Sequence, residues 1–180
     1  MDQNHFLVVC ETKMNGKGVF AQRNFEKDEP IIEFRGELLT HEQLPDPYDP
    51  ADDHYLQIGK NLYLGPSGGI DDMFNHSCDP NSGVKFGDKV ILVAIKDIYR
   101  GEEILFDYST TLNDEAWEMD CNCGCRNCRG KIRDFKYLPR KVQQKYLNLG
   151  IVPDYISESY VKKYGLADLR VCGAGAMGGM

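Results

Sequence analysis

The sequence predicts a mostly β protein with some α structure, in which a small helical region follows the strands. Three observations predict this class: short runs of alternating apolar residues, turn residues between these runs, and a change to helical spacing after residue 130. Many short strands joined by turns favour a compact β-rich fold over a β-α-β arrangement. The 180 residues suit one domain with an appendage.

The first part of the chain is expected to form short strands and turns. Residues 6–12 (FLVVCET) are typical of a strand, and residues 14–18 of a turn. Further strands are expected within 18–25 and 30–39, where apolar residues partly alternate. Residues 44–53 contain three prolines and four aspartates, which predicts a loop.

Two hairpins and two helices are expected next. Residues 54–69 predict a hairpin with its turn near Gly59 to Asn61, and residues 85–98 predict one that turns at Gly87-Asp88. Val142, Tyr146 and Leu149 have helical spacing, with Gly150 as a plausible stop. A second helix is expected from Pro153, near its start, to Gly165 at its end.

Charge and composition limit the function classes. The net charge of −7 argues against a general nucleic-acid binder and permits a cationic partner. No charged N-terminal segment precedes a long apolar run, and no apolar stretch is long enough to cross a bilayer. We therefore expect an intracellular protein with metal-bound or free thiols, no membrane association and no direct nucleic-acid binding. Cys10 and Cys172 lie outside any motif and are expected to be small buried groups.

A dense cluster of cysteines points to metal. The segment DCNCGCRNCRG, residues 120–130, contains four cysteines, and NHSCDPN, residues 75–81, contains Cys78. Thiolates at such short spacing suit tetrahedral zinc. One possible ligand set is the local group within the first segment, although wrapping four thiolates from eight residues around one ion is strained. That local set is Cys121, Cys123, Cys125 and Cys128.

The order of three motifs identifies a family resemblance. NHSC at 75–78, EEILFDY at 102–108 and C-x-C-x4-C at 121–128 resemble the SET-domain family of protein lysine methyltransferases with a post-SET zinc clip. The resemblance covers roughly residues 17–129. It implies a β-clip of short strands in which the NHSC segment is threaded through a neighbouring loop, a pseudoknot-like arrangement. The expected units are a SET domain over 1–118, a post-SET zinc clip over 119–130, a helical extension over 131–172 and a disordered tail over 173–180.

The resemblance also implies an activity and two cofactors. The expected reaction is methyl transfer from S-adenosylmethionine to the ε-amine of a lysine in a protein or peptide, with histones or other basic segments as candidates. A structural zinc is implied on Cys78, Cys121, Cys123 and Cys128, which leaves Cys125 as a spare thiol. Two alternatives stay open: a catalytically silent SET-like module that binds a partner, and a zinc-dependent nucleic-acid-binding module, which the acidic charge disfavours.

Tyr108 matches the catalytic tyrosine of the family. Only about one free lysine in two thousand is neutral at pH 7, because its pKa is near 10.4. An apolar channel beside a positive sulfonium lowers that pKa, so a tyrosine need only orient the amine and the methyl group. Without the motif, Tyr108 would be interpreted as a strand-end tyrosine whose hydroxyl bonds a backbone carbonyl.

Other site residues follow from the same resemblance. Phe34 and Phe106 are expected to line the lysine channel, Phe34 standing where the family usually has a tyrosine. Phe106 lacks a hydroxyl that would crowd the amine, which implies products beyond monomethyl-lysine. Asp72 stands where family members often have an arginine. Either Trp117 or Phe135 is expected to add an apolar wall beside the cofactor. The expected cofactor-binding residues are Lys17 and Gly18 of the Gly-x-Gly segment, Asn75, His76, Tyr108 and Trp117.

Overall fold

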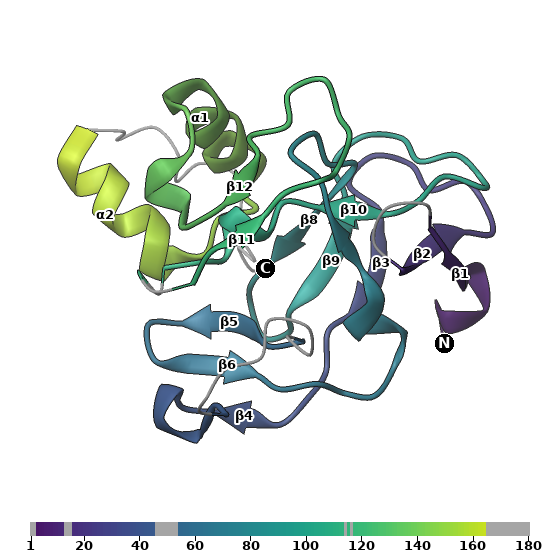
Figure 1. The fold of residues 1–180 in the computed structure, drawn as a ribbon, viewed down its shortest axis with the longest axis horizontal. Helices are drawn as coiled ribbons and strands as arrows, with labels where there is room; N and C mark the ends of the chain where they lie inside the picture. Colours follow the sequence, from purple (N-terminus) through teal and green to yellow (C-terminus); the bar gives the residue numbers. More distant parts are fainter. Residues whose placement is uncertain (1–2, 13–15, 46–53, 114, 116, 165–180) are drawn as a thin grey trace, which may run out of the picture.

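The computed structural model describes residues 3–12, 16–45, 54–113, 115 and 117–164. Within them, small sheets of short strands make up most of the molecule, and two helices lie together at one side (Figure 1). The predicted class, mostly β with a helical extension, is confirmed. No helix in these ranges is both long and apolar enough to cross a membrane.

The central sheet has the strand order β3-β9-β8 and is antiparallel throughout. Its strands are β3 (Pro30–Glu33), β8 (Ser82–Lys85) and β9 (Ile91–Ala94). Strands β8 and β9 form the hairpin predicted around Gly87-Asp88. The middle strand, β9, carries Leu92 and Ala94, both fully buried, because this sheet is covered on its core side.

Two further antiparallel groups flank this sheet. Strand β1 (Leu7–Glu11) pairs with β2 (Lys17–Ala21), and both lie within apolar runs that were predicted to be strands. The second group has the order β4-β6-β5. It is formed by β4 (Leu38–Leu39), β5 (Leu56–Gly59) and β6 (Leu62–Leu64), and β5 and β6 are the other predicted hairpin.

A parallel pair joins two of the sequence motifs. Strand β7 (Asn75–His76) pairs with β10 (Leu105–Phe106), so NHSC and EEILFDY lie side by side. Asn81 strengthens the join. Its side-chain amide donates to the Glu103 carbonyl at 2.8 Å, and its side-chain oxygen accepts from the Leu105 N–H at 2.8 Å. These contacts tie together segments that are far apart in the sequence, as the predicted threaded arrangement requires.

The cysteine-rich segment connects two short strands. Strand β11 (Met119–Asp120) pairs antiparallel with β12 (Lys131–Ile132), so the cysteines of residues 121–128 lie in the connecting loop of a hairpin. This hairpin crosses the predicted boundary at residue 130, and the unit boundaries stay a prediction.

Helices α1 (Arg140–Leu149) and α2 (Asp154–Tyr164) form the C-terminal part of the described chain. Gly150 ends α1 in the left-handed region, with φ of 64°, and its N–H bonds the last carbonyls of the helix, as the sequence predicted. The buried face of α1 carries Gln143, Tyr146 and Leu147. Five single-turn 3-10 helices complete the described elements: Gln3–Phe6, His41–Gln43, Ile70–Met73, Tyr108–Thr110 and Phe135–Tyr137.

The core has two main parts. The larger lies among the sheets and includes Val19, Ile31, Leu92 and Ile104, all fully buried. The smaller lies under the helices and includes Phe135, Tyr146, Ile151 and Ile156. Each part buries apolar surface that its elements could not cover alone, which is the dominant favourable contribution to folding.

One sequence expectation is wrong, and several others concern residues outside the described ranges. Cys10 is exposed on β1, because its position on the strand faces solvent rather than the core. Cys172, the helix end at Gly165, the tail from 173 and most of the loop at 44–53 lie outside the described residues.

Candidate active site and cysteine cluster

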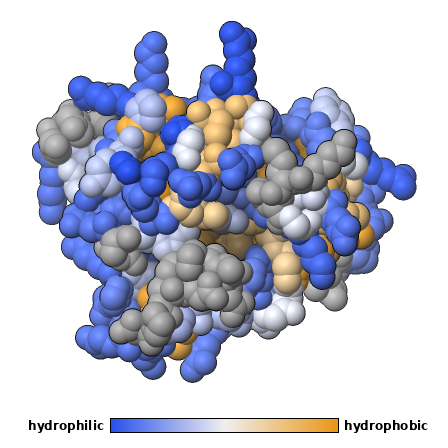
Figure 2. Space-filling model, viewed as in Figure 1, coloured by the Kyte–Doolittle hydropathy of each residue, from blue (hydrophilic) through white to orange (hydrophobic). Residues whose placement is uncertain are grey.

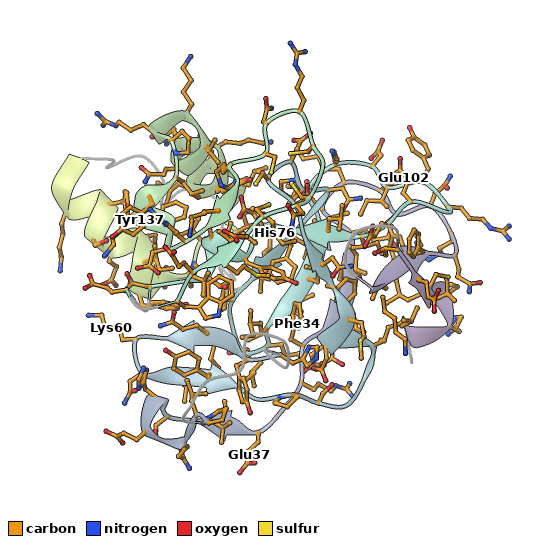
Figure 3. The ribbon with its side chains drawn as sticks, in the orientation of Figure 1. Phe34, Glu37, Lys60, His76, Glu102 and Tyr137 are labelled. Atoms are coloured by element: carbon orange, nitrogen blue, oxygen red, sulfur yellow. The ribbon has the colours of Figure 1, made fainter. Side chains whose placement is uncertain are left out.

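A cleft of about 330 Å³ lies between the β4-β6-β5 sheet and the β7-β10 pair. Figure 2 shows a recess near the middle of this face, with apolar side chains at its floor. Figure 3 places Phe34 and His76 in the same central region. Six of the predicted site residues line the cleft: Lys17, Phe34, Asn75, Phe106, Tyr108 and Trp117.

Aromatic rings form one wall of the cleft. The ring of Phe34 meets those of Phe74 and Phe106 edge to face, with centroids 6.1 and 6.0 Å away. The ring of Phe106 lies 4.8 Å from that of Tyr108. Edge-to-face rings pack rigidly and without polar atoms. The two predicted channel residues therefore lie together beside Tyr108, and Phe74 joins them from a position that the motifs did not single out.

Tyr108 is anchored at both ends. Its hydroxyl donates to the Phe74 carbonyl at 2.7 Å, and its backbone N–H donates to Nδ1 of His76 at 3.2 Å. The bond to a backbone carbonyl is the feature expected if Tyr108 has only a structural role at the end of a strand. The position in an aromatic cleft is compatible with the catalytic role that the resemblance implies. The two roles do not exclude each other, because a hydroxyl held by this bond has a fixed direction.

Two of the predicted cofactor residues, Gly18 and His76, do not line the cleft. A Cβ at Gly18 would collide with the side chains of Glu103 and Asn75, so the absence of a side chain serves packing between segments. Asn75 connects the same segments, because its side-chain amide donates at 2.8 Å both to the Lys17 carbonyl and to the Glu103 carboxylate.

His76 connects Tyr108 to the cysteines. Its Nε2 lies 3.3 Å from Sγ of Cys78, while Nδ1 accepts the Tyr108 N–H. Burial lowers the pKa of His76 to about 4, against the opposing effect of the nearby Asp107 carboxylate. The ring is therefore neutral at pH 7, and since Nδ1 is an acceptor, Nε2 carries the proton and donates toward the sulfur.

The sulfur atoms of the two cysteine segments come together. Sγ of Cys121 lies 3.7 Å from that of Cys78 and 3.6 Å from that of Cys128. Four sulfurs held about 2.3 Å from a tetrahedral zinc lie about 3.8 Å from one another, so these spacings suit the edges of such a site. Sγ of Cys123 lies 3.5 Å from that of Cys125.

The candidate ligand atoms are not all thiols. Ligand atoms of His76, Cys78, Cys121 and Cys123 lie within 4.8 Å of one another. All six cysteines in the described ranges are free thiols.

Burial raises the pKa of Cys78, and it raises that of Cys121 to about 11. Burial also acts to raise the pKa of Cys123. Hydrogen bonds from the backbone of Cys78 and Cys125 to its sulfur outweigh this effect and lower the pKa of the thiol to about 6. A metal cation would relieve the cost of forming thiolates here.

The sequence reasoning missed a buried network next to Tyr108. Asp107 is 1% exposed and accepts two hydrogen bonds from Arg129, at 2.7 and 2.8 Å, and one from Tyr146 at 3.0 Å. No short motif links these three residues, because they come from the segment after β10, the cysteine loop and α1. The sequence signal was indirect: an arginine directly after a cysteine of the clip.

Two remaining expectations concern Phe135 and Asp72. Phe135 lies in the core under the helices, with its ring 5.1 Å from that of Tyr160, so of the two candidate wall residues only Trp117 lines the cleft. Asp72 accepts hydrogen bonds from the backbone N–H groups of Ser67 and Gly68, which closes the turn before the 3-10 helix at residues 70–73. Its carboxylate therefore has a local structural role where family members often carry arginine.

Comparison with known proteins identifies the class. A family model described as the SET domain matches residues 16–109, and the chain therefore belongs to the SET-domain family. The crystal structure of KRYPTONITE in complex with mCHH DNA, H3(1-15) peptide and SAH has a similar fold, with a TM-score of 0.58 and 20% identity. That similarity covers 70% of this chain and 29% of KRYPTONITE.

Curated relatives within the family are named as histone-lysine N-methyltransferases. The chain is 31% identical over 139 residues to trr of Drosophila melanogaster and 32% identical over 150 residues to mes-4 of Caenorhabditis elegans. It is 28% identical over 137 residues to human histone-lysine N-methyltransferase 2B. These matches cover 68%, 70% and 67% of this chain, but only 6%, 16% and 5% of the relatives.

Proposed function

We propose that this protein transfers methyl groups from S-adenosylmethionine to the ε-amine of a lysine in a basic protein segment. The observation that carries the proposal is the convergence of Phe34, Phe106 and Tyr108 on one cleft. The relatives named as histone-lysine N-methyltransferases support a histone as the substrate class. The unit boundaries given in the sequence analysis stay part of this proposal. The site roles and cofactors described below are proposed because the residues belong to the family motifs and lie at the cleft or in the cysteine cluster.

The residues of the cleft would prepare a neutral amine for reaction. Loss of hydration between Phe34 and Phe106, together with the positive sulfonium of the cofactor, disfavours an ammonium ion, which promotes loss of its proton to solvent before reaction. The hydroxyl of Tyr108, fixed by its bond to the Phe74 carbonyl, would orient the amine. S-adenosylmethionine supplies the methyl group: the amine lone pair forms the new C–N bond, the C–S bond breaks, and its electron pair stays on sulfur. The methylated amine then loses a proton to solvent.

The cleft also fits a cationic cofactor. Trp117 and Tyr108 offer aromatic faces that attract a positive sulfonium. Lys17 and Asn75 lie at the same cleft and bring polar groups for the remainder of the molecule. We assign cofactor binding to these four residues, and to Gly18 and His76 a supporting role through the segments that they hold together.

A structural zinc fits the chemistry of the cysteine cluster. The proposed ligands are Cys78, Cys121, Cys123 and Cys128, and the approach of the Cys121 sulfur to those of Cys78 and Cys128 supports this set. The ligand atoms that all lie within 4.8 Å of one another are those of Cys78, Cys121, Cys123 and His76, so Cys128 would have to move closer to complete the set. Such an ion supplies folding free energy rather than reaction chemistry, because it would join the cysteine loop to the NHSC segment. His76 is well placed to donate to the Cys78 thiolate, which would support the ligand from outside.

The test is methyl transfer from labelled S-adenosylmethionine to core histones and to a lysine-rich peptide. We expect label on lysine, identified by mass spectrometry, with wild-type protein. Tyr99→Phe is the matched control, since Tyr99 is 58% exposed and lies outside the cleft. Absence of transfer to any protein, in a preparation that binds S-adenosylmethionine, would favour the alternative of a silent module that binds a partner.

A further inference from the structure

The carboxylate of Asp107 is the buried centre of a network directly before Tyr108. The side chain of Asp107 is fully buried. One of its oxygens accepts the Ser109 N–H at 3.1 Å, which caps the 3-10 turn of residues 108–110. The Asp107 carbonyl accepts from the backbone N–H of Thr110 at 2.9 Å and from its hydroxyl at 2.7 Å. Asp107 therefore fixes the backbone turn on which Tyr108 stands.

Two side chains from elsewhere in the chain hold this carboxylate. Arg129 donates to both of its oxygens, in the paired geometry that fixes a carboxylate most strictly. The hydroxyl of Tyr146, a residue only 1% exposed, donates to one of them at 3.0 Å. Burial works against the charge on Arg129, but its hydrogen bonds to Asp107 outweigh burial and raise its pKa. A buried carboxylate that accepts four hydrogen bonds, two of them from Arg129, cannot turn without leaving a charge unpaired.

These partners link three parts of the molecule. Arg129 follows Cys128 in the cysteine loop, and its backbone N–H lies 3.4 Å from Sγ of Cys78. Tyr146 belongs to α1. Asp107 follows β10. The cysteine loop and the helical extension thus bind the same carboxylate, one residue before Tyr108.

None of the three residues lines the cleft. Neither peptide nor cofactor in the cleft would contact them, so their effect on the reaction would pass through Tyr108. We propose that Asp107, Arg129 and Tyr146 are positioning residues that set the orientation of Tyr108, and that α1 is therefore part of the active-site scaffold. This inference rests on the proposed role of Tyr108 in methyl transfer.

The most informative variant is Tyr146→Phe, because it removes one hydrogen bond and little volume. A displacement of about 1 Å at a reacting group can lower turnover by roughly 100-fold. Since Arg129 remains in place, we expect a smaller fall in kcat, roughly 3-fold to 10-fold, with unchanged KM for peptide and cofactor. Tyr160→Phe is the matched control: its hydroxyl, also in the helical extension, bonds Gln143 at 3.2 Å and not Asp107.

A double-mutant cycle with Tyr108→Phe tests whether the effect passes through Tyr108. If it does, Tyr146→Phe lowers kcat in the wild-type background and has no further effect in the Tyr108→Phe background. An equal factor in both backgrounds, an effect confined to KM, or no effect beyond that of Tyr160→Phe overturns the inference. Arg129→Lys, which keeps the charge but loses the paired geometry, should lower kcat more than Tyr146→Phe does.

A second measurement does not depend on turnover. In protein labelled with 3-fluorotyrosine, the fluorine resonance of Tyr108 is the one lost in Tyr108→Phe. Tyr146→Phe and Arg129→Lys should shift or broaden this resonance, and Tyr160→Phe should not. An unmoved Tyr108 resonance in both network variants overturns the inference. If Tyr108→Phe alone has normal turnover, the proposed role of Tyr108 fails instead, while the fluorine spectra still report on positioning.

Discussion

At the scale of single residues, Tyr108 occupies a position that suits orientation better than proton transfer. Its hydroxyl already donates to a backbone carbonyl, and its ring lies 4.8 Å from that of Phe106 and 5.3 Å from that of His76. A group held in this way is preorganised, so little entropy remains to be lost when substrate arrives. Loss of hydration in the cleft and the positive sulfonium of the cofactor, and not a charged base, would keep the amine neutral.

Tyr108→Phe should therefore keep the fold and lose most methyl transfer. The ring and its packing remain, while the hydroxyl that would orient the amine is removed. We expect turnover to fall by roughly 100-fold, with a melting temperature within a few degrees of wild type. A thermal melt and a turnover assay on one preparation measure both. Near-normal turnover in the folded variant would remove Tyr108 from the proposed role.

Phe106 bears on how many methyl groups are added. Its ring lies 6.0 Å from that of Phe34, and neither ring carries a hydroxyl that would hold the amine or a water molecule. We therefore propose products beyond monomethyl-lysine. Phe106→Tyr should shift the products toward monomethyl-lysine, measured by mass spectrometry during a time course with excess cofactor. Wild-type protein that stops at monomethyl-lysine, or an unchanged distribution in the variant, would contradict the idea.

At the scale of elements, the cysteine loop contacts the NHSC segment at Cys78, whose sulfur is approached by Sγ of Cys121 and by the backbone N–H of Arg129. Ligands from two distant segments around one zinc would close a long loop, which stabilises the folded state. Cys78→Ser should therefore lose zinc and fold less stably, whereas Cys125→Ser should keep both. Metal analysis of dialysed protein, paired with a thermal melt, makes the comparison. Zinc retained in Cys78→Ser but lost in Cys125→Ser would instead indicate the local ligand set.

Close packing between elements predicts a cost at Gly18. A new Cβ would collide with Glu103, and would lie 2.7 Å from the Asn75 amide and 2.8 Å from a Thr12 methyl group. Gly18→Ala should lower the free energy of unfolding by about 1–3 kcal/mol. Gly87→Ala is the control, since nothing lies within 4 Å of a Cβ there. Denaturant unfolding compares the two, and equal stabilities would refute the packing argument.

The sequence predicted those elements whose signal is local. The hairpins at residues 56–64 and 82–94 and the helix ending at Gly150 each carry their own turn or cap residues. The two-residue strands β7 and β10 have no such signal, because their pairing depends on contacts between distant segments. The same reason hides the network of Asp107, Arg129 and Tyr146. The site residues within motifs were predicted by resemblance, and their roles stay proposals.

At the scale of the whole molecule, charge is unevenly distributed along the chain. Residues 1–120 contain 24 acidic and 10 basic side chains, while residues 121–180 contain 4 acidic and 11 basic. The cleft itself is lined by Lys17 and Arg35 as well as by Asp71 and Asp72, so the acidic excess of residues 1–120 lies mostly outside it. A lysine-rich peptide would be attracted to such a surface, and salt would weaken that attraction. The absence of direct nucleic-acid binding stays a prediction, which a gel shift at low salt measures.

Attraction of this kind predicts how substrate binding depends on salt. The KM for a lysine-rich peptide should rise severalfold, by roughly 3-fold to 10-fold, between low salt and a few hundred millimolar, because the Debye length falls below the distances that separate most of these charges. The KM for S-adenosylmethionine should change less, since it depends on contacts inside the cleft.

The control is a peptide with the same target lysine in which glutamine replaces the other basic residues. This peptide should bind more weakly at low salt and show little dependence on salt. If both peptides respond to salt equally, or if neither responds, long-range charge does not select the substrate. Selection would then depend on contacts in the cleft, with the aromatic channel of Phe34 and Phe106 accepting a lysine irrespective of the charge around it.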